Sequence, residues 1–97
     1  MHMNPDIEQL KRVIVPILQK AGATRSAIFG SVARNQATAE SDIDILVELK
    51  ECMGLFGFIA LQQKLEDALH KKVDLVEYEA LKPRLREKIL REQISIL

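Results

Sequence analysis

The stretch IFGSVARNQATAESDIDILVEL, residues 28–49, places a polar segment between two apolar runs. The second run alternates in the manner of a strand, yet it carries Asp42 and Asp44. Aspartate is depleted in strands, and burying a carboxylate that has no partner is costly. We therefore expect another part of the molecule to compensate for these two charges, and we expect that compensation to be tied to function.

The spacing of the two aspartates predicts where their side chains lie. Because strand side chains alternate between faces, Asp42 and Asp44 should share one face, while Ile43, Ile45 and Val47 enter the core. Two neighbouring carboxylates repel each other unless water or a cation surrounds them. Mg²⁺ takes oxygen ligands and leaves positions open for substrate phosphates. Two interpretations remain open here: a strand with one solvated face, or a Mg²⁺ site that handles phosphates.

Three further features favour the phosphate site. Gly30 and Ser31 end the preceding strand, where glycine allows backbone to approach a ligand and serine offers a hydroxyl and N–H groups to phosphate oxygens. Asp74 interrupts the apolar run KVDLVE and would reach the same metal from a neighbouring strand. Arg34, on the turn after Ser31, would reach the same phosphates. Each feature also has a simpler interpretation. Gly30 and Ser31 would form an ordinary turn, Asp74 would be a charge on an edge strand, and Arg34 would be a solvated surface residue.

Apolar spacing predicts the order helix, strand, short helix, strand, helix, strand, helix. This order is typical of the α/β (α+β) class, with a small mixed sheet flanked by helices. A chain of 97 residues leaves no room for a second core, so we expect a single domain over residues 1–97. Helices are expected within 4–21, 31–37, 55–70 and 82–94, strands within 24–29, 41–49 and 72–77, and an extended segment at 95–97.

The ends of the first helix are marked by residues with known positional preferences. Asn4 is a suitable N-cap, Pro5 fits the first helical position and Gly22 ends the apolar spacing. Pro16 lies inside the helix, where it should remove one backbone hydrogen bond and produce a kink.

Composition and charge exclude several classes of protein. The 14 basic and 14 acidic residues balance, which gives no reason to expect direct binding to nucleic acid or to an anionic membrane. Cys52 is the only cysteine, so an internal disulfide and a cysteine zinc site are excluded. No run approaches the ~20 apolar residues of a membrane span, and no signal peptide is recognised. We expect a cytoplasmic protein.

The segments GSVARNQATAESDIDILVE, KVDLVE and ALKPRLREKILREQ together resemble the minimal nucleotidyltransferases, the MNT domains of the DNA polymerase beta-like superfamily. The resemblance extends over essentially the whole chain and implies the nucleotidyltransferase fold. It also implies transfer of a nucleoside monophosphate from ATP to a hydroxyl, with release of pyrophosphate. Asp42 and Asp44 would then bind Mg²⁺, in a site for two metal ions, and Asp74 would complete it and help deprotonate the acceptor. Gly30 and Ser31 would hold the triphosphate.

The chain departs from the family pattern at two places. Family members often carry a glycine at the position of Asn35 and a second arginine near Thr38. The acidic residues are intact, but a cation that binds phosphate is missing, and a lower affinity for triphosphate is expected.

The resemblance also implies a partner. MNT proteins are often paired with a HEPN-domain toxin, an RNase, and act as its antitoxin by adenylylating one of its tyrosines. A chain this short has no domain to cover the nucleotide, so we expect a hetero-oligomer in which the toxin supplies part of the acceptor pocket. Two alternatives remain: an inactive relative that masks the toxin by binding alone, and an enzyme that modifies a small molecule such as an aminoglycoside.

Two stretches are candidates for contact with such a partner. CMGLFGFIA, residues 52–60, is mainly apolar, and the plainer expectation is a helix start folded into the core. In the last helix Arg84, Lys88 and Arg91 share a face, for which a solvated surface is the default.

Overall fold

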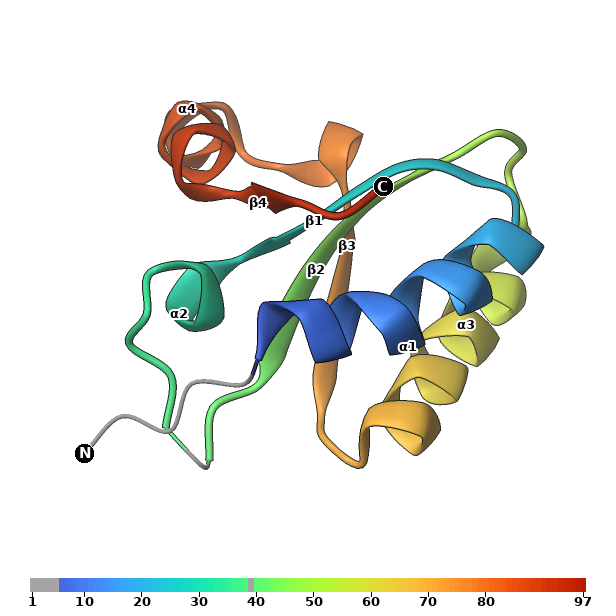
Figure 1. Cartoon of the computed structure of the whole chain (residues 1–97). Coiled ribbons are helices and arrows are strands. Elements are labelled where there is room, and N and C mark those ends of the chain that lie inside the picture. Colours follow the sequence, from blue (N-terminus) through green and yellow to red (C-terminus); the bar gives the residue numbers. More distant parts are fainter. Residues whose placement is uncertain (1–5, 39) are drawn as a thin grey trace.

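The protein, in a computed structural model that describes residues 6–38 and 40–97, forms one mixed four-stranded sheet with helices on both faces (Figure 1). The strand order is β3-β2-β1-β4. β1 runs antiparallel to β2 and β4, whereas β2 and β3 are parallel. The predicted fold class is therefore confirmed. The elements are α1 (Ile7–Lys20), β1 (Ala23–Phe29), α2 (Gly30–Ala33), β2 (Ile43–Leu49), α3 (Gly54–Leu69), β3 (Val73–Glu77), the 3₁₀ turn η1 (Tyr78–Ala80), α4 (Pro83–Glu92) and β4 (Ile94–Ser95).

The two faces of the sheet carry separate apolar clusters. On one face Ile43, Ile45 and Val47 of β2 pack with α1 and α3 in the larger cluster, as their alternation predicts. On the other face a smaller cluster lies under α4. Figure 1 shows α1 and α3 together on one side of the sheet and α4 on the other. The smaller cluster consists of Ala27, Phe29, Leu46 and Tyr78, with Val76, Leu81, Ile89 and Leu90 packed against it.

Both ends of α1 are defined by polar or flexible residues. Asp6 is the N-cap, and its Oδ1 accepts a hydrogen bond from the backbone N–H of Glu8 at 2.9 Å. Asn4 and Pro5, the predicted N-cap and first helical residue, lie outside the described residues. The helix continues through Pro16 to Lys20, and Gly22 follows in the left-handed region, with φ +86°.

The end of the chain joins the sheet as an edge strand. β4 pairs with β1 through Ser95 opposite Ala27 and Ile94 opposite Ile28, which confirms the expected extended segment. Ile96 is buried at 4% exposure, so this edge contributes to the core. None of the helices within the described part of the chain is long and apolar enough to cross a bilayer.

The expectation that residues 52–60 fold into the core is wrong for five of their side chains, those of Cys52, Leu55, Phe56, Ile59 and Ala60. Leu55, Phe56 and Ile59 are exposed, whereas Met53 and Phe58 pack against the larger cluster. The physical reason is that the buried face of α3 is narrow, since its buried residues are Leu61 and Leu65. A helix in which most first-turn positions are apolar cannot bury all of them on one face.

Candidate active site

Asp44 and Asp74 occupy paired positions on two neighbouring parallel strands. The Cα atoms of Asp44 in β2 and Asp74 in β3 are register partners. Side chains at paired positions stand on the same face of a sheet, which here is the face opposite Ile43 and Ile45. Asp42 lies one residue before β2 and is exposed. The fold therefore brings the three predicted carboxylates to one end of the sheet, where β2 and β3 begin.

The turn after β1 lies directly against Asp44. Phe29, the last residue of β1, is the register partner of Asp44 on its other side. Gly30 follows with φ +72°, in the region that favours glycine. A Cβ atom at this position would collide with Oδ2 of Asp44. The glycine thus provides the space in which the Asp44 carboxylate lies.

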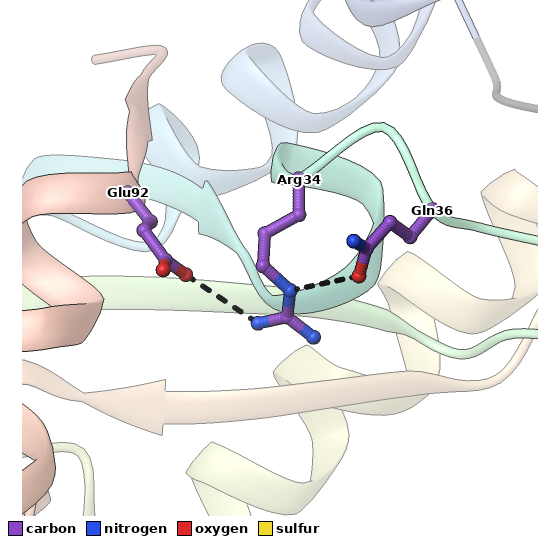
Figure 2. A network of polar contacts seen from close by, with 3 residues as sticks. All are labelled: Arg34, Gln36 and Glu92. Atoms are coloured by element: carbon purple, nitrogen blue, oxygen red, sulfur yellow. Dashed lines mark hydrogen bonds and ion pairs between the residues drawn. The ribbon is translucent and has the colours of Figure 1, made fainter.

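Ser31 and Arg34 lie on and just after the single helical turn that follows Gly30. Ser31 is the second residue of α2 and is half-buried. Arg34 is the C-cap of α2, and its guanidinium lies between two side chains that Figure 2 shows from close by. Its Nε donates to Oε1 of Gln36 at 3.3 Å, and its Nη1 donates to Oε2 of Glu92 at 3.5 Å. The predicted phosphate-binding arginine is therefore paired with a carboxylate from α4.

The electrostatics of Asp44 show that these groups act on one another. The pKa of the Asp44 carboxyl is raised from 3.8 to about 6, and burial is the largest cause. The negative charges of Asp74 and Asp42 contribute to this increase, and the positive charge of Arg34 opposes it. The end of the sheet thus holds more negative charge than its surroundings neutralise, and a bound cation would relieve the excess.

Asp42, Asp44 and Asp74 offer oxygen ligands suited to a hard divalent cation, although their carboxylates do not point toward a common position. Carboxylate oxygens are the ligands that Mg²⁺ prefers, and a bound cation would offset the repulsion between Asp44 and the neighbouring carboxylates. Within residues 6–38 and 40–97, no three acidic, histidine or cysteine side chains are arranged to hold a metal ion. Binding would therefore need rotation of these aspartate side chains toward the ion.

Two polar residues near the site were missed by the sequence reasoning. Lys71, before β3, donates from Nζ to the carbonyl of Ser41 at 3.3 Å, next to Asp42. Glu92 reaches Arg34 across a separation of 58 residues. The only sequence signal for Lys71 was its place beside the strand that carries Asp74, and for Glu92 there was none.

Thr38 has a structural use in the segment that leads to Asp42. Oγ of Ser41 accepts a hydrogen bond from the Thr38 N–H at 2.9 Å, and the two hydroxyls lie 3.3 Å apart. Thr38 and Ser41 thus stabilise a turn just before Asp42.

The sequence matches the family model described as polymerase beta, nucleotidyltransferase over residues 12–97. A Methanocaldococcus jannaschii protein, named as a candidate protein adenylyltransferase, is 45% identical over 92 residues, which cover 95% of this chain and 99% of that protein. The protein adenylyltransferase MntA of Thermococcus cleftensis is 37% identical over 78 residues, or 80% of this chain and 79% of that protein.

Solved structures have the same fold. A candidate minimal nucleotidyltransferase matches with a TM-score of 0.79 and 40% identity, covering 96% of both chains. A toxin–antitoxin structure with AMP-PNP matches with a TM-score of 0.79 and 25% identity, covering 90% of this chain and 72% of that one. A tri-AMPylated HEPN toxin of Shewanella oneidensis in complex with an MNT antitoxin matches with a TM-score of 0.73, 93% of this chain and 71% of that one; at 23% identity this likeness shows the fold alone.

Proposed function

The chain belongs to the polymerase beta nucleotidyltransferase family, and from this premise we propose that it transfers AMP from ATP to a tyrosine hydroxyl of a HEPN RNase toxin and so acts as its antitoxin. Support for a protein substrate comes from relatives named protein adenylyltransferases, which match most of the chain. Support for a toxin partner comes from the solved toxin–antitoxin structure with AMP-PNP, which is 25% identical to this chain. The working state is then a hetero-oligomer with the toxin.

The observation that carries this proposal is the register of Asp44 and Asp74, with Gly30 packed against Asp44. Two aspartates side by side, of which Asp44 is half-buried, destabilise a strand pair through their repulsion, so a purely structural role does not account for them. The same pair is useful where a substrate brings both phosphates and a cation.

In the proposed reaction the acceptor oxygen attacks the α-phosphorus of ATP, and the bond to pyrophosphate breaks. Asp42, Asp44 and Asp74 would hold Mg²⁺, which when bound neutralises the triphosphate and favours ionisation of the acceptor hydroxyl. Asp74 is exposed, and it would accept the acceptor proton. Gly30 and Ser31 would hold the triphosphate tail. Positioning and charge neutralisation would then supply most of the rate.

Arg34 is proposed to bind the triphosphate after exchanging its partner. Its contact with Glu92 is 3.5 Å long and partly exposed, so phosphate oxygens, which carry more charge, would compete well for the guanidinium. Because no other lysine or arginine lies between Gly30 and Asp42, Arg34 would be the main cation from this segment.

The proposal is tested by intact mass spectrometry of the toxin encoded beside this chain. The purified pair is incubated with ATP and Mg²⁺. We expect the toxin to gain one or more AMP units, and we expect Asp42→Asn and Asp44→Asn to abolish the gain. A toxin mass that stays unchanged with the native chain, in a complex that forms normally, would refute the transfer.

A second candidate is neutralisation by binding alone, and two observations favour it. Within the described residues no three acidic side chains are set to hold a metal, and Arg34 is already paired with Glu92. This function predicts that Asp42→Asn and Asp44→Asn protect cells from the toxin as well as the native chain does. The transfer function predicts that both variants lose protection.

A further inference from the structure

The first turn of α3 carries an apolar surface that the fold leaves uncovered. Leu55, Phe56 and Ile59 are 71%, 86% and 52% exposed, and we call these three side chains the α3 patch. Among the described residues only one other large hydrophobic side chain, Leu85 at 48%, is classed as exposed. Apolar side chains gathered on one helix turn mark a surface for association, whereas single exposed ones need no explanation.

An acidic hollow adjoins the α3 patch. Leu55 and Phe58 line a shallow depression beside the patch, and this depression continues through Cys52 and Glu77 into a second one of about 260 Å³. We call this second depression the acidic hollow. Four carboxylates line the acidic hollow around Tyr78. Two cations lie beside it: Arg25, whose guanidinium stacks 4.1 Å from the centroid of the Tyr78 ring, and Arg86, whose Nη1 donates to the Tyr78 carbonyl at 3.0 Å. Negative charge therefore dominates next to the α3 patch. The four carboxylates are those of Glu48, Glu51, Glu77 and Glu79.

This surface is separate from the candidate active site, yet one partner can cover both. Glu48 follows Asp44 by four residues in β2, which places it roughly 13 Å farther along the strand at ~3.3 Å per residue. The first turn of α3 follows the end of that strand, at the opposite end of the sheet from the start of β2 (Figure 1). A small domain is about 30 Å across, so it spans the two places.

The charge around the α3 patch selects among the possible occupants. A second copy in a two-fold dimer would bring the patch and its carboxylates against their own equivalents, and like charges oppose that pairing. A membrane surface carries anionic lipids, which the same carboxylates repel. A protein segment with apolar side chains flanked by lysine or arginine complements both features.

We propose that the α3 patch and the acidic hollow form the docking surface for the protein that receives AMP. The toxin would place apolar side chains against Leu55, Phe56 and Ile59, and a lysine or arginine in the hollow between Glu51 and Glu77. The inference rests on the proposed function for the identity of this partner. It assigns recognition to one end of the sheet and chemistry to the other.

The test measures binding of the toxin to the native chain and to two surface variants, by calorimetry without ATP. Phe56→Ser removes the most exposed apolar side chain, and Glu51→Lys reverses one charge of the hollow. We expect each to weaken binding about 10-fold or more, as expected for the centre of an interface. With ATP and Mg²⁺, the KM for toxin should rise by a similar factor, while kcat at saturating toxin stays unchanged.

Matched controls separate docking from general surface effects. Leu85→Ser removes an exposed apolar side chain of α4, and Glu87→Lys reverses an exposed charge on the same helix. Both should bind toxin as the native chain does. Melting curves of all four variants should match, because each substituted side chain is exposed.

The outcomes distinguish this inference from the proposed function. Unchanged binding by Phe56→Ser and Glu51→Lys, with normal AMP transfer by the native chain, overturns the docking surface alone. Weakened binding with no transfer by the native chain overturns the proposed function alone. A native chain that does not bind the toxin, or a native dimer that Phe56→Ser converts to monomer in light scattering, overturns the docking proposal.

Discussion

At the scale of single residues, Asp44 is the side chain at which stability and proposed function conflict. Its carboxyl is half-buried, its pKa is raised to about 6, and both other carboxylates of the site contribute to the increase. Without a cation, the folded protein therefore holds a charge that the unfolded chain would leave in water. Such conflicts are expected at functional sites, where local consistency is given up for chemistry.

The first prediction is that Asp44→Asn stabilises the metal-free protein. The pKa of Asp44 is higher in the folded state than its value of 3.8, so this group favours folding most below about pH 4 and loses that contribution as the pH rises to about 6. The variant should therefore gain on the order of 1 kcal/mol at pH 7, after allowance for solvent screening, and nothing near pH 4. Urea unfolding in EDTA at both pH values measures this difference.

The second prediction concerns the space beside Asp44. Gly30→Ala puts a side chain at φ +72° and a Cβ against the Asp44 carboxylate, so it should destabilise the fold by about 1–2 kcal/mol and abolish AMP transfer. Gly22→Ala is the matched control, because Gly22 has φ +86° but nothing within 4 Å of its Cβ position. It should lose stability by a similar amount and keep its activity. Equal activity of the two variants would contradict the role of Gly30.

Sequence reasoning reached individual site residues because their signals are local. Period-2 alternation was enough to place Asp44 on the face away from the core, and the Gly30-Ser31 turn follows β1 as predicted. Contacts between residues far apart in the sequence could not be predicted in this way. Lys71 meets Ser41 across a separation of 30 residues, and no periodicity encodes such a meeting.

At the scale of secondary structure, the order of helices and strands was predictable, and their pairing was not. Each helix and strand shows its own apolar spacing in the sequence. The register of β2 with β3, however, depends on how α3, which connects the two strands, packs on the sheet. A shift of one residue would have placed Asp74 on the opposite face from Asp44. The sequence also did not reveal how many apolar side chains of α3 are exposed. Apolar spacing shows which face of a helix is buried, but it does not show how many side chains that face covers.

The third prediction concerns the contact between α2 and α4. Glu92→Gln removes the carboxylate that shares the Arg34 guanidinium, so it should tighten binding of ATP by about 2- to 5-fold, the range expected for an exposed ion pair. Glu87→Gln on the same helix is the control and should leave the affinity unchanged. Calorimetric titration with an ATP analogue and Mg²⁺ at low ionic strength measures the effect. Weaker binding by Glu92→Gln would mean that Glu92 positions Arg34 and does not compete for it.

At the scale of the whole molecule, the proposed site of chemistry and the proposed docking surface lie at opposite ends of the sheet. Asp44 and Asp74 lie where β2 and β3 begin, whereas the α3 patch and the acidic hollow lie past their other ends. Gly30 of α2 lies against Asp44, and Glu92 of α4 pairs with Arg34, so two further elements contribute to the proposed catalytic end. This separation allows substitutions at one end to test one task while leaving the other measurable.

The fourth prediction follows from the excess negative charge of the whole catalytic end. Mg²⁺ with a non-hydrolysable ATP analogue binds only the folded state, and at 100 times the Kd it should add about 2.7 kcal/mol to the free energy of unfolding. For a domain of this size, that raises the Tm by more than about 10 °C. EDTA should reverse the increase, and the variant with both Asp42→Asn and Asp44→Asn should show none of it. Because that variant also lacks the repulsion, it should melt above the native protein in EDTA and below it with both ligands. An equal rise of the Tm in both proteins would place the metal and the nucleotide away from these aspartates.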